Sequence, residues 1–308
     1  MRTDRFDMTI IGGIGIDTNI YLHGEEIDFS VEMNFSENLD YVGQVGGYAA
    51  RLSARLGNRT AFIGFVGDDY NGRFVREVLH DDGINHDALF IDPRGTKRAV
   101  NFMYPDGRRR NFYDGKGSME TKPDPMICNR LLEKTTVAHF SIVDWARTLL
   151  PVAKRFGATV SCDIQDIVSM DDAYRKDFID AADILFFSSA NHPDPTSLVQ
   201  EFLKGKPNRI VICGMGPRGC MTGTSSKIRH HPAVELDTPV IDTNGAGDSL
   251  AVGFLTSYLL EGRSLDDSVL RGQLCARHTC SQKADSSHLI SSEKLDGILR
   301  DKRFRVNR

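Results

Sequence analysis

The sequence has no paired cysteine motif, no long apolar run and no strong excess of one charge. Its six cysteines are scattered without a CxxC pair, so a zinc ribbon or thioredoxin-like site has no support. Lysine plus arginine number 38 against 42 acidic residues, which argues against a protein built to coat nucleic acid. No uncharged run approaches the ~18 residues that cross a bilayer, and the first residues lack the apolar core of a signal peptide. We therefore expect a cytoplasmic protein with reduced thiols and with neither membrane nor nucleic acid among its partners.

What is present is an ordinary globular composition over 308 residues, with 40% hydrophobic and 26% charged residues. Short apolar runs alternate with helical stretches, which predicts βαβ units and an α/β fold with a doubly wound, mostly parallel sheet. Two other stretches alternate polar and apolar residues, and Asp106-Gly107 between two aromatic arms predicts a hairpin. We expect a large domain of residues 1–17, 46–96 and 116–308, with residues 18–45 and 97–115 forming a small β lid over the carboxyl ends of the strands.

The segment from Asp242 to Ser249 carries the strongest chemical signal. It follows a strand-like Pro239–Ile241 and opens a long apolar helix. Its small residues Gly245, Ala246 and Gly247 let backbone N–H groups approach an anion at a helix N-terminus. A transferring phosphoryl group needs this arrangement, because its catalysis is mainly positioning and charge stabilisation. Asp248 at the same place would repel phosphate, but it makes sense as the general base for a substrate hydroxyl.

This segment resembles the C-terminal signature of the ribokinase-like carbohydrate kinases, the phosphofructokinase-B type family. The resemblance implies that Asp248 deprotonates the acceptor hydroxyl, that the preceding small residues form the anion hole, and that the donor is ATP with Mg²⁺. An aspartate that merely caps a helix after a glycine turn is the bland alternative. The matching positions are Asp242, Gly245, Gly247, Asp248, Gly253 and Phe254.

Two N-terminal segments are similar to the family's acceptor-binding elements. A dinucleotide-binding loop at Gly12–Gly15 fails as an alternative, because the third glycine is missing and β-like sequence follows. The family commonly has a second glycine where Gln44 stands and an asparagine where Tyr48 stands, so the identity of the acceptor stays open. Tyr48 is either a core aromatic or a pocket residue. The acceptor-binding residues that the resemblance implies are Asp17, Gly43, Gln44, Gly46, Gly47 and Tyr48.

A glycine-rich loop near residue 216 resembles the family's nucleotide loop, and residues 275–285 match the helix and turn that border the adenine pocket. The resemblance also implies a monovalent cation such as K⁺, held near Asp242 and Asn244. The family's Asn-x-x-Glu element is missing from residues 188–194, so Mg²⁺ is expected to be held mainly by ATP oxygens and water. The nucleotide-binding residues implied are Ser189, Gly214, Gly216, Arg218, Gly219 and Gln273.

Together these features predict a kinase that transfers the γ-phosphate of ATP to a primary hydroxyl of a sugar. A nucleoside kinase of the same fold is an alternative, because aromatic residues of the lid could stack on a base. A sugar or nucleoside sensor with weak catalysis is another, motivated by the missing Asn-x-x-Glu element. Arg108-Arg109-Arg110 reads first as a solvated turn, and secondly as a source of one arginine that reaches a phosphate. The lid also invites a homodimer through its exposed β surface.

Overall fold

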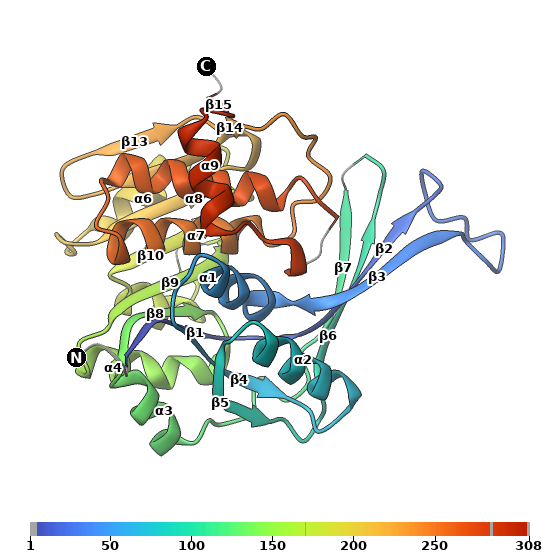
Figure 1. Ribbon diagram of the computed structural model, residues 1–308, viewed down its shortest axis with the longest axis horizontal. Coiled ribbons are helices and arrows are strands. Elements are labelled where there is room, and N and C mark those ends of the chain that lie inside the picture. Colours follow the sequence, from blue (N-terminus) through green and yellow to red (C-terminus); the bar gives the residue numbers. More distant parts are fainter. Residues whose placement is uncertain (1–4, 107, 170, 284–285, 307–308) are drawn as a thin grey trace.

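The computed structural model describes residues 5–106, 108–169, 171–283 and 286–306, and its main feature is a large sheet of nine strands (Figure 1). The strand order is β13-β12-β11-β10-β9-β8-β1-β4-β5, and only β12 and β13 run antiparallel to their neighbours. The predicted doubly wound, mostly parallel α/β sheet is therefore confirmed. The strands are β1 (Phe6–Ile11), β4 (Thr60–Val66), β5 (Asn85–Ile91), β8 (Thr135–Ser141), β9 (Thr159–Asp166), β10 (Ile184–Ser188), β11 (Ile210–Gly214), β12 (Cys220–Gly223) and β13 (Ile228–His231).

Helices cover both faces of this sheet, because its parallel strands are apolar on both sides. Ile10 belongs to one buried core and the next residue, Ile11, to the other, as alternation along a strand requires. Buried residues of α1 (Arg51–Arg55), α2 (Tyr70–Asp81), α7 (Ala246–Leu255), α8 (Leu265–Thr279) and α9 (Ser292–Arg300) pack into the core of Ile10. Those of α3 (Pro125–Leu132), α4 (Leu150–Arg155), α5 (Lys176–Ala181) and α6 (Thr196–Leu203) pack into the core of Ile11.

A second sheet of four strands, which we call the lid, lies to one side of the large sheet (Figure 1). Its order is β3-β2-β6-β7, and β2 pairs in parallel with β6. Only residues 12–14 separate β1 from β2, so the first lid strand continues directly from the end of a core strand. The predicted turn residue Gly107 lies outside the described residues. The lid strands are β2 (Gly15–Leu22), β3 (Ser36–Gly43), β6 (Lys97–Met103) and β7 (Arg109–Asp114), and a separate ribbon pairs β14 (Val234–Glu235) with β15 (Arg305–Val306).

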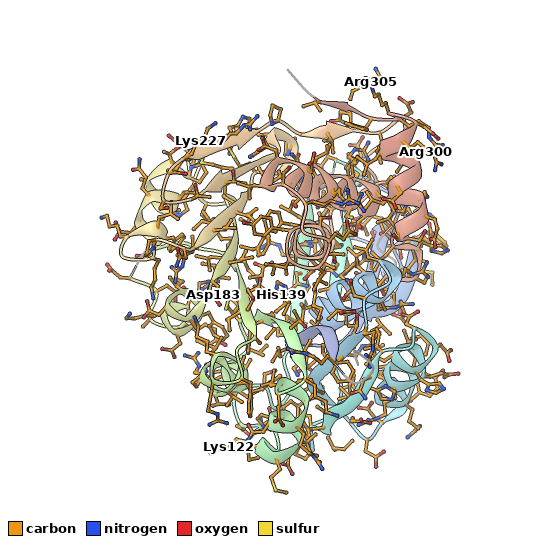
Figure 2. The ribbon with its side chains drawn as sticks, turned by 60° about the vertical axis from the view of Figure 1, so that its left-hand side comes forward. Lys122, His139, Asp183, Lys227, Arg300 and Arg305 are labelled. Carbon is orange, nitrogen blue, oxygen red and sulfur yellow. The ribbon has the colours of Figure 1, made fainter. Side chains whose placement is uncertain are left out.

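The interior contains unpaired cysteines and a buried histidine. All six cysteines are buried and free, as the sequence predicted. His139 lies in the middle of the molecule, whereas Lys122 and Arg300 lie at its periphery (Figure 2). Burial lowers the pKa of His139 to about 4, so this histidine is neutral at physiological pH. Within the described part of the chain, no helix combines the length and the apolar character that a bilayer crossing needs.

Candidate active site

The chain segment that leads into α7 differs from the predicted one. Pro239–Ile241 was expected to be a strand, and this prediction is wrong, because the segment joins no sheet. Pro239 has no N–H to donate, and the N–H groups of Ile241 and Asp242 both donate to the carbonyl of Cys280, at 2.7 and 3.3 Å. The segment is thus hydrogen-bonded to the end of α8 and not to a neighbouring strand.

The start of α7 carries the three N–H groups that were predicted to bind an anion, and one of them already has a partner. Gly245 precedes the helix with a φ of +72°, and a Cβ there would lie 2.1 Å from the Tyr48 ring, so only glycine fits. The N–H of Ala246 donates to the carbonyl of Thr243 at 3.3 Å, whereas those of Gly245 and Gly247 donate to no described residue. Gly247 is also exposed. The N–H groups of Gly245 and Gly247 are therefore the ones available to a phosphate.

Asp248 lies in the first turn of α7 with two other carboxylates near it. Burial, followed by repulsion from Asp163 and Asp17, raises the pKa of Asp248 to about 8. Asp163 comes from the end of β9, and a Cβ on Gly247 would lie 4.0 Å from its Oδ2 atom. Burial also raises the pKa values of Asp163 and Asp17 to about 6. Three elements thus bring their carboxylates to one place, where a proton can be held or released near neutral pH.

The predicted acceptor residues surround Asp17 on β2. Asp17 is 9% exposed, and its Oδ2 atom lies 2.2 Å from where a Cβ on Gly43 would be, so the glycine leaves room for the carboxylate. Gln44 has a φ of +61°, an uncommon conformation for a residue with a side chain, which is often found at functional sites. Its buried Nε2 atom has no hydrogen-bond partner among the described residues. Gly46 and Gly47 are buried in the turn before α1.

Tyr48 is a core aromatic, and its role in an acceptor pocket stays a prediction. Its side chain is 3% exposed, and its ring packs edge-on against Tyr41 with the centroids 5.9 Å apart. The same ring occupies the space beside Gly245. Tyr48 is therefore a core aromatic that also forms the wall behind the anion hole.

The lid reaches the loop before α7 through Arg109. Its Nη1 atom donates to Oδ1 of Asn244. Arg108 instead pairs at the surface with Asp106 and Glu26. The arginine run is thus a solvated turn at Arg108, and it sends one guanidinium toward the site at Arg109.

Asp242 and Asn244 do not offer a cation site in this arrangement. Oδ2 of Asp242 accepts from Tyr21 at 2.7 Å and from Asn19 at 3.2 Å, and its Oδ1 accepts from the N–H of Asn244 at 2.8 Å. Oδ1 of Asn244 faces the cationic guanidinium of Arg109. A monovalent cation would have to displace these donors, so these two side chains do not fit the ion.

The predicted nucleotide residues gather at the ends of β10 and β11. The N–H of Ser189 donates to the carbonyl of Gly214 at 2.9 Å, and Nη2 of Arg218 lies 3.4 Å from the Ser189 hydroxyl. Gly216 and Gly219 both have positive φ angles. Gln273 is buried on α8 and shares no hydrogen bond with this loop in the described part of the chain.

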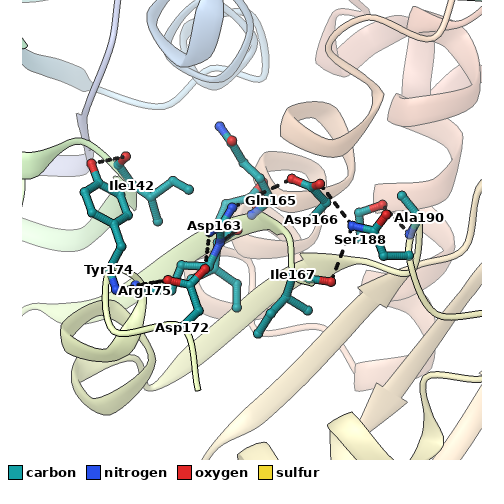
Figure 3. Close-up of polar contacts among 12 residues, drawn as sticks. Ile142, Asp163, Gln165, Asp166, Ile167, Asp172, Tyr174, Arg175, Ser188 and Ala190 are labelled. Carbon is teal, nitrogen blue, oxygen red and sulfur yellow. Dashed lines mark hydrogen bonds and ion pairs between the residues drawn. The ribbon is translucent and has the colours of Figure 1, made fainter. Parts of the chain in front are cut away.

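The ends of β9 and β10 show what replaces the family's usual polar element. Oδ1 of Asp163 accepts from the N–H of Gln165 at 2.8 Å, at an irregular end of β9 where Gln165 has a φ of +59°. Figure 3 shows the Gln165 side chain pointing away from Arg175, which binds the carbonyl of Ile164 at 2.9 Å and the carboxylate of Asp172. Asn191 donates to Asp166 at 3.1 Å. The Gln165 side chain makes no hydrogen bond to a described residue, so it is available to a ligand.

Sequence reasoning missed the lid residues that face this loop. Asn19 and Tyr21 of β2 bind Asp242, and Asn101 of β6 binds Asn19 at 2.8 Å. Asn19 and Asn101 are almost fully buried. Buried polar residues at alternate positions of a lid strand are a signal, because polar side chains are buried only where partners exist.

The comparison with known protein families decides the assignment. The family model described as pfkB family carbohydrate kinase matches residues 14–291. The chain belongs to the pfkB family of carbohydrate kinases. It is therefore a carbohydrate kinase, as the resemblance implied, and the motif around Asp248 is part of the matched region.

Relatives of this kinase act on several sugars. The chain is 28% identical over 300 residues to acarbose 7(IV)-phosphotransferase of Actinoplanes sp., covering 95% of this chain and 98% of the relative. It is 27% identical over 266 residues to ATP-dependent ribose-1-phosphate kinase of Halopiger xanaduensis, covering 82% of this chain and 88% of the relative. The solved structure of the microbiome-derived acarbose kinase Mak1 superposes with a TM-score of 0.86 at 27% identity, covering 96% of this chain and 99% of that one. The solved structure of Arabidopsis thaliana ribokinase supports the fold, with a TM-score of 0.81 at 18% identity. The match covers 96% of this chain and 99% of that one.

Proposed function

We propose that this carbohydrate kinase transfers the γ-phosphate of ATP to a hydroxyl, preferably a primary one, of a sugar. The observation that carries the proposal is the position of Asp248, next to the available N–H groups of Gly245 and Gly247 and within electrostatic range of Asp17. A base, an anion hole and an acceptor-binding carboxylate in one place are the parts that phosphoryl transfer to a hydroxyl needs.

In this mechanism Asp17 and the Gly43–Tyr48 segment hold the acceptor. Asp248 accepts the proton of the attacking hydroxyl, and the amides of Gly245 and Gly247 stabilise charge on the transferring group. With its pKa raised to about 8, Asp248 is a stronger base than an ordinary carboxylate, but it is mostly protonated at neutral pH. Binding of a cation nearby would lower that pKa and leave the carboxylate ready to accept a proton.

The nucleotide is assigned to the loop of Ser189, Gly214, Gly216, Arg218 and Gly219. Within the described ranges no cluster of three or more His, Cys, Asp or Glu residues could hold a metal ion. We propose that Mg²⁺ arrives with ATP and keeps mostly phosphate and water ligands. Mg²⁺ bound in this way neutralises part of the phosphate charge. We leave K⁺ out of the mechanism, because the side chains of Asp242 and Asn244 are already engaged.

The test is ADP release from ATP and Mg²⁺ over a panel of sugars, sugar phosphates and nucleosides, each with and without K⁺. We expect rapid turnover with a neutral sugar acceptor and little change on adding K⁺. Turnover with a nucleoside alone would replace the sugar by a nucleoside as acceptor. Binding by thermal shift without turnover for any acceptor would contradict the proposal and favour a sensor.

A further inference from the structure

A row of asparagines crosses the lid on the side that faces the active site. Asn111 of β7 lies opposite Asn101 of β6, and Asn101 lies opposite Asn19 of β2. Residues paired in this way point to the same side of a sheet. Nδ2 of Asn111 donates to Oδ1 of Asn101, and Nδ2 of Asn101 donates to Oδ1 of Asn19, both at 2.8 Å. Asn19 then donates to the carboxylate of Asp242 at 3.2 Å. One chain of hydrogen bonds thus runs from the outer strand to the loop before α7.

The carboxylate at the inner end sets the direction of this chain. The Asp242 oxygens accept three hydrogen bonds, so Asn19 must turn its NH₂ group toward them. Asn101 and Asn111 are then oriented in the same way, because each NH₂ group needs the next carbonyl oxygen. The outer end of the chain is the carbonyl oxygen of Asn111, which is exposed and accepts no hydrogen bond from a described residue. The row therefore presents an acceptor to a ligand that donates, such as a hydroxyl group.

Tyr113 lies on the same side of the same strand. It pairs with Ala99, which pairs with Asp17, so the Tyr113 ring lies in the row of the acceptor-binding carboxylate with only a methyl group between them. Tyr113 is 53% exposed. Burial raises the pKa of Tyr113 to about 12, against a hydrogen bond with Ser118 that lowers it, and the nearby Asp17 adds to the rise. An aromatic face and a hydroxyl acceptor thus lie side by side on β7.

We propose that Asn111 and Tyr113 form a second sugar subsite, so that the preferred acceptor is a neutral glycoside of at least two rings. The proposal rests on the proposed function, because it extends the same acceptor site. β7 lies two strand spacings from β2, about 10 Å, which is beyond the reach of a single ring held at Asp17. A second ring places its hydroxyls on the Asn111 carbonyl and its apolar face on Tyr113. A phosphorylated sugar fits less well, because Arg109, the cation on this side of β7, is engaged with Asn244.

The experiment compares binding of glycosides with binding of their own monosaccharides. Calorimetry on the full-length protein is carried out with Mg²⁺ and a non-hydrolysable ATP analogue. Glucose is compared with maltose and maltotriose, and fructose with sucrose. Ribose is compared with ribose 5-phosphate to measure the effect of a phosphate group. We expect one neutral glycoside to bind at least about tenfold more tightly than its monosaccharide. Tyr113→Ala and Asn111→Ala should each remove most of that advantage and leave monosaccharide affinity within about twofold.

Phe112→Ala is the matched control, because Phe112 is the adjacent residue of β7, is similarly exposed at 58%, and points to the opposite side of the lid. It should retain the full glycoside advantage. The inference is overturned if no neutral glycoside binds more tightly than its monosaccharide, or if Phe112→Ala loses as much as Tyr113→Ala. ADP release is measured separately, and its absence with every sugar counts against the proposed kinase reaction rather than against the subsite.

Discussion

Asp248, the proposed general base, lies in an environment that opposes its charge. Burial is the main cause of its raised pKa, and the like charges of Asp163 and Asp17 add to it. A carboxylate with an ordinary pKa would be ionised but weakly basic, whereas one with a pKa near 8 is a stronger base that is mostly protonated at pH 7. The rate of the free enzyme should therefore rise with pH as Asp248 loses its proton.

Removing the charge of Asp163 should shift the pH dependence of the rate to lower pH. Asp163→Asn abolishes one repulsive charge, so the pKa of Asp248 falls and the rising limb of kcat/KM moves to lower pH by about one unit. The measurement is a pH profile of kcat/KM with the best acceptor. Asp166→Asn, at the exposed end of the same strand, is the control and should leave the limb in place. An unmoved limb in Asp163→Asn would mean that Asp248 does not set the pH dependence.

Gly245 should tolerate no side chain. In Gly245→Ala the new methyl group meets the Tyr48 ring in a backbone conformation that alanine disfavours, so the anion hole must shift. We expect kcat to fall by at least about tenfold, as for loss of an oxyanion-hole donor. Gly57→Ala, which also has a positive φ but open space around it, separates backbone strain from crowding. Equal losses of activity in both variants would contradict the account of the Tyr48 wall.

At the scale of elements, a side chain on one side of β7 contacts the loop before α7. Arg109 reaches Asn244 and lowers the pKa of Asp17, whereas Arg110 points to the opposite side. Arg109→Gln should raise the pKa of Asp17 and lower kcat/KM for the acceptor by about tenfold or more. Steady-state kinetics of Arg109→Gln and Arg110→Gln compare the two sides of the strand. Similar kinetics in both variants would show that Arg109 is only a surface charge.

The sequence was sufficient for the order of elements but not for their contacts across the lid. Apolar runs between helical stretches were enough to predict the parallel sheet, because its strands are buried on both faces. An apolar run also led to the wrong prediction of a strand at Pro239–Ile241. This segment is not a strand, because the N–H of Ile241 donates to the carbonyl of Cys280 at the end of α8. The asparagine row depends on the register of three strands, and register follows from folding rather than from local spacing.

In the candidate site too, contiguous motifs could be predicted from the sequence, whereas contacts between distant residues could not. The motif around Asp248 is contiguous, so its sequence was enough to predict a base and an anion hole. The contact of Arg109 with Asn244 joins residues 135 positions apart and has no local signal. The engagement of Asp242 and Asn244 by lid donors, which leaves no place for the predicted cation, could be found only with the lid in position.

At the scale of the whole molecule, the lid is the part of the chain through which a homodimer was predicted. The loop between β2 and β3 exposes Phe29, Met33 and Phe35, with 90%, 68% and 74% of their surfaces accessible. We expect a homodimer formed through this part of the lid. Light scattering coupled to size exclusion should give twice the chain mass, and Phe29→Ser with Phe35→Ser should give the monomer. A monomeric wild-type protein across the accessible concentrations would contradict the prediction.

The most direct test of the account is the rate of ADP release by Asp248→Asn with the best acceptor. Because asparagine cannot take the hydroxyl proton, we predict a fall in kcat of about 10² to 10⁴-fold, with acceptor affinity within about twofold of wild type. The variant should remain folded, because asparagine has the shape of aspartate and removes a carboxylate whose ionisation burial opposes. A kcat close to that of the wild type would show that Asp248 is not the base, and the proposed mechanism would then be wrong.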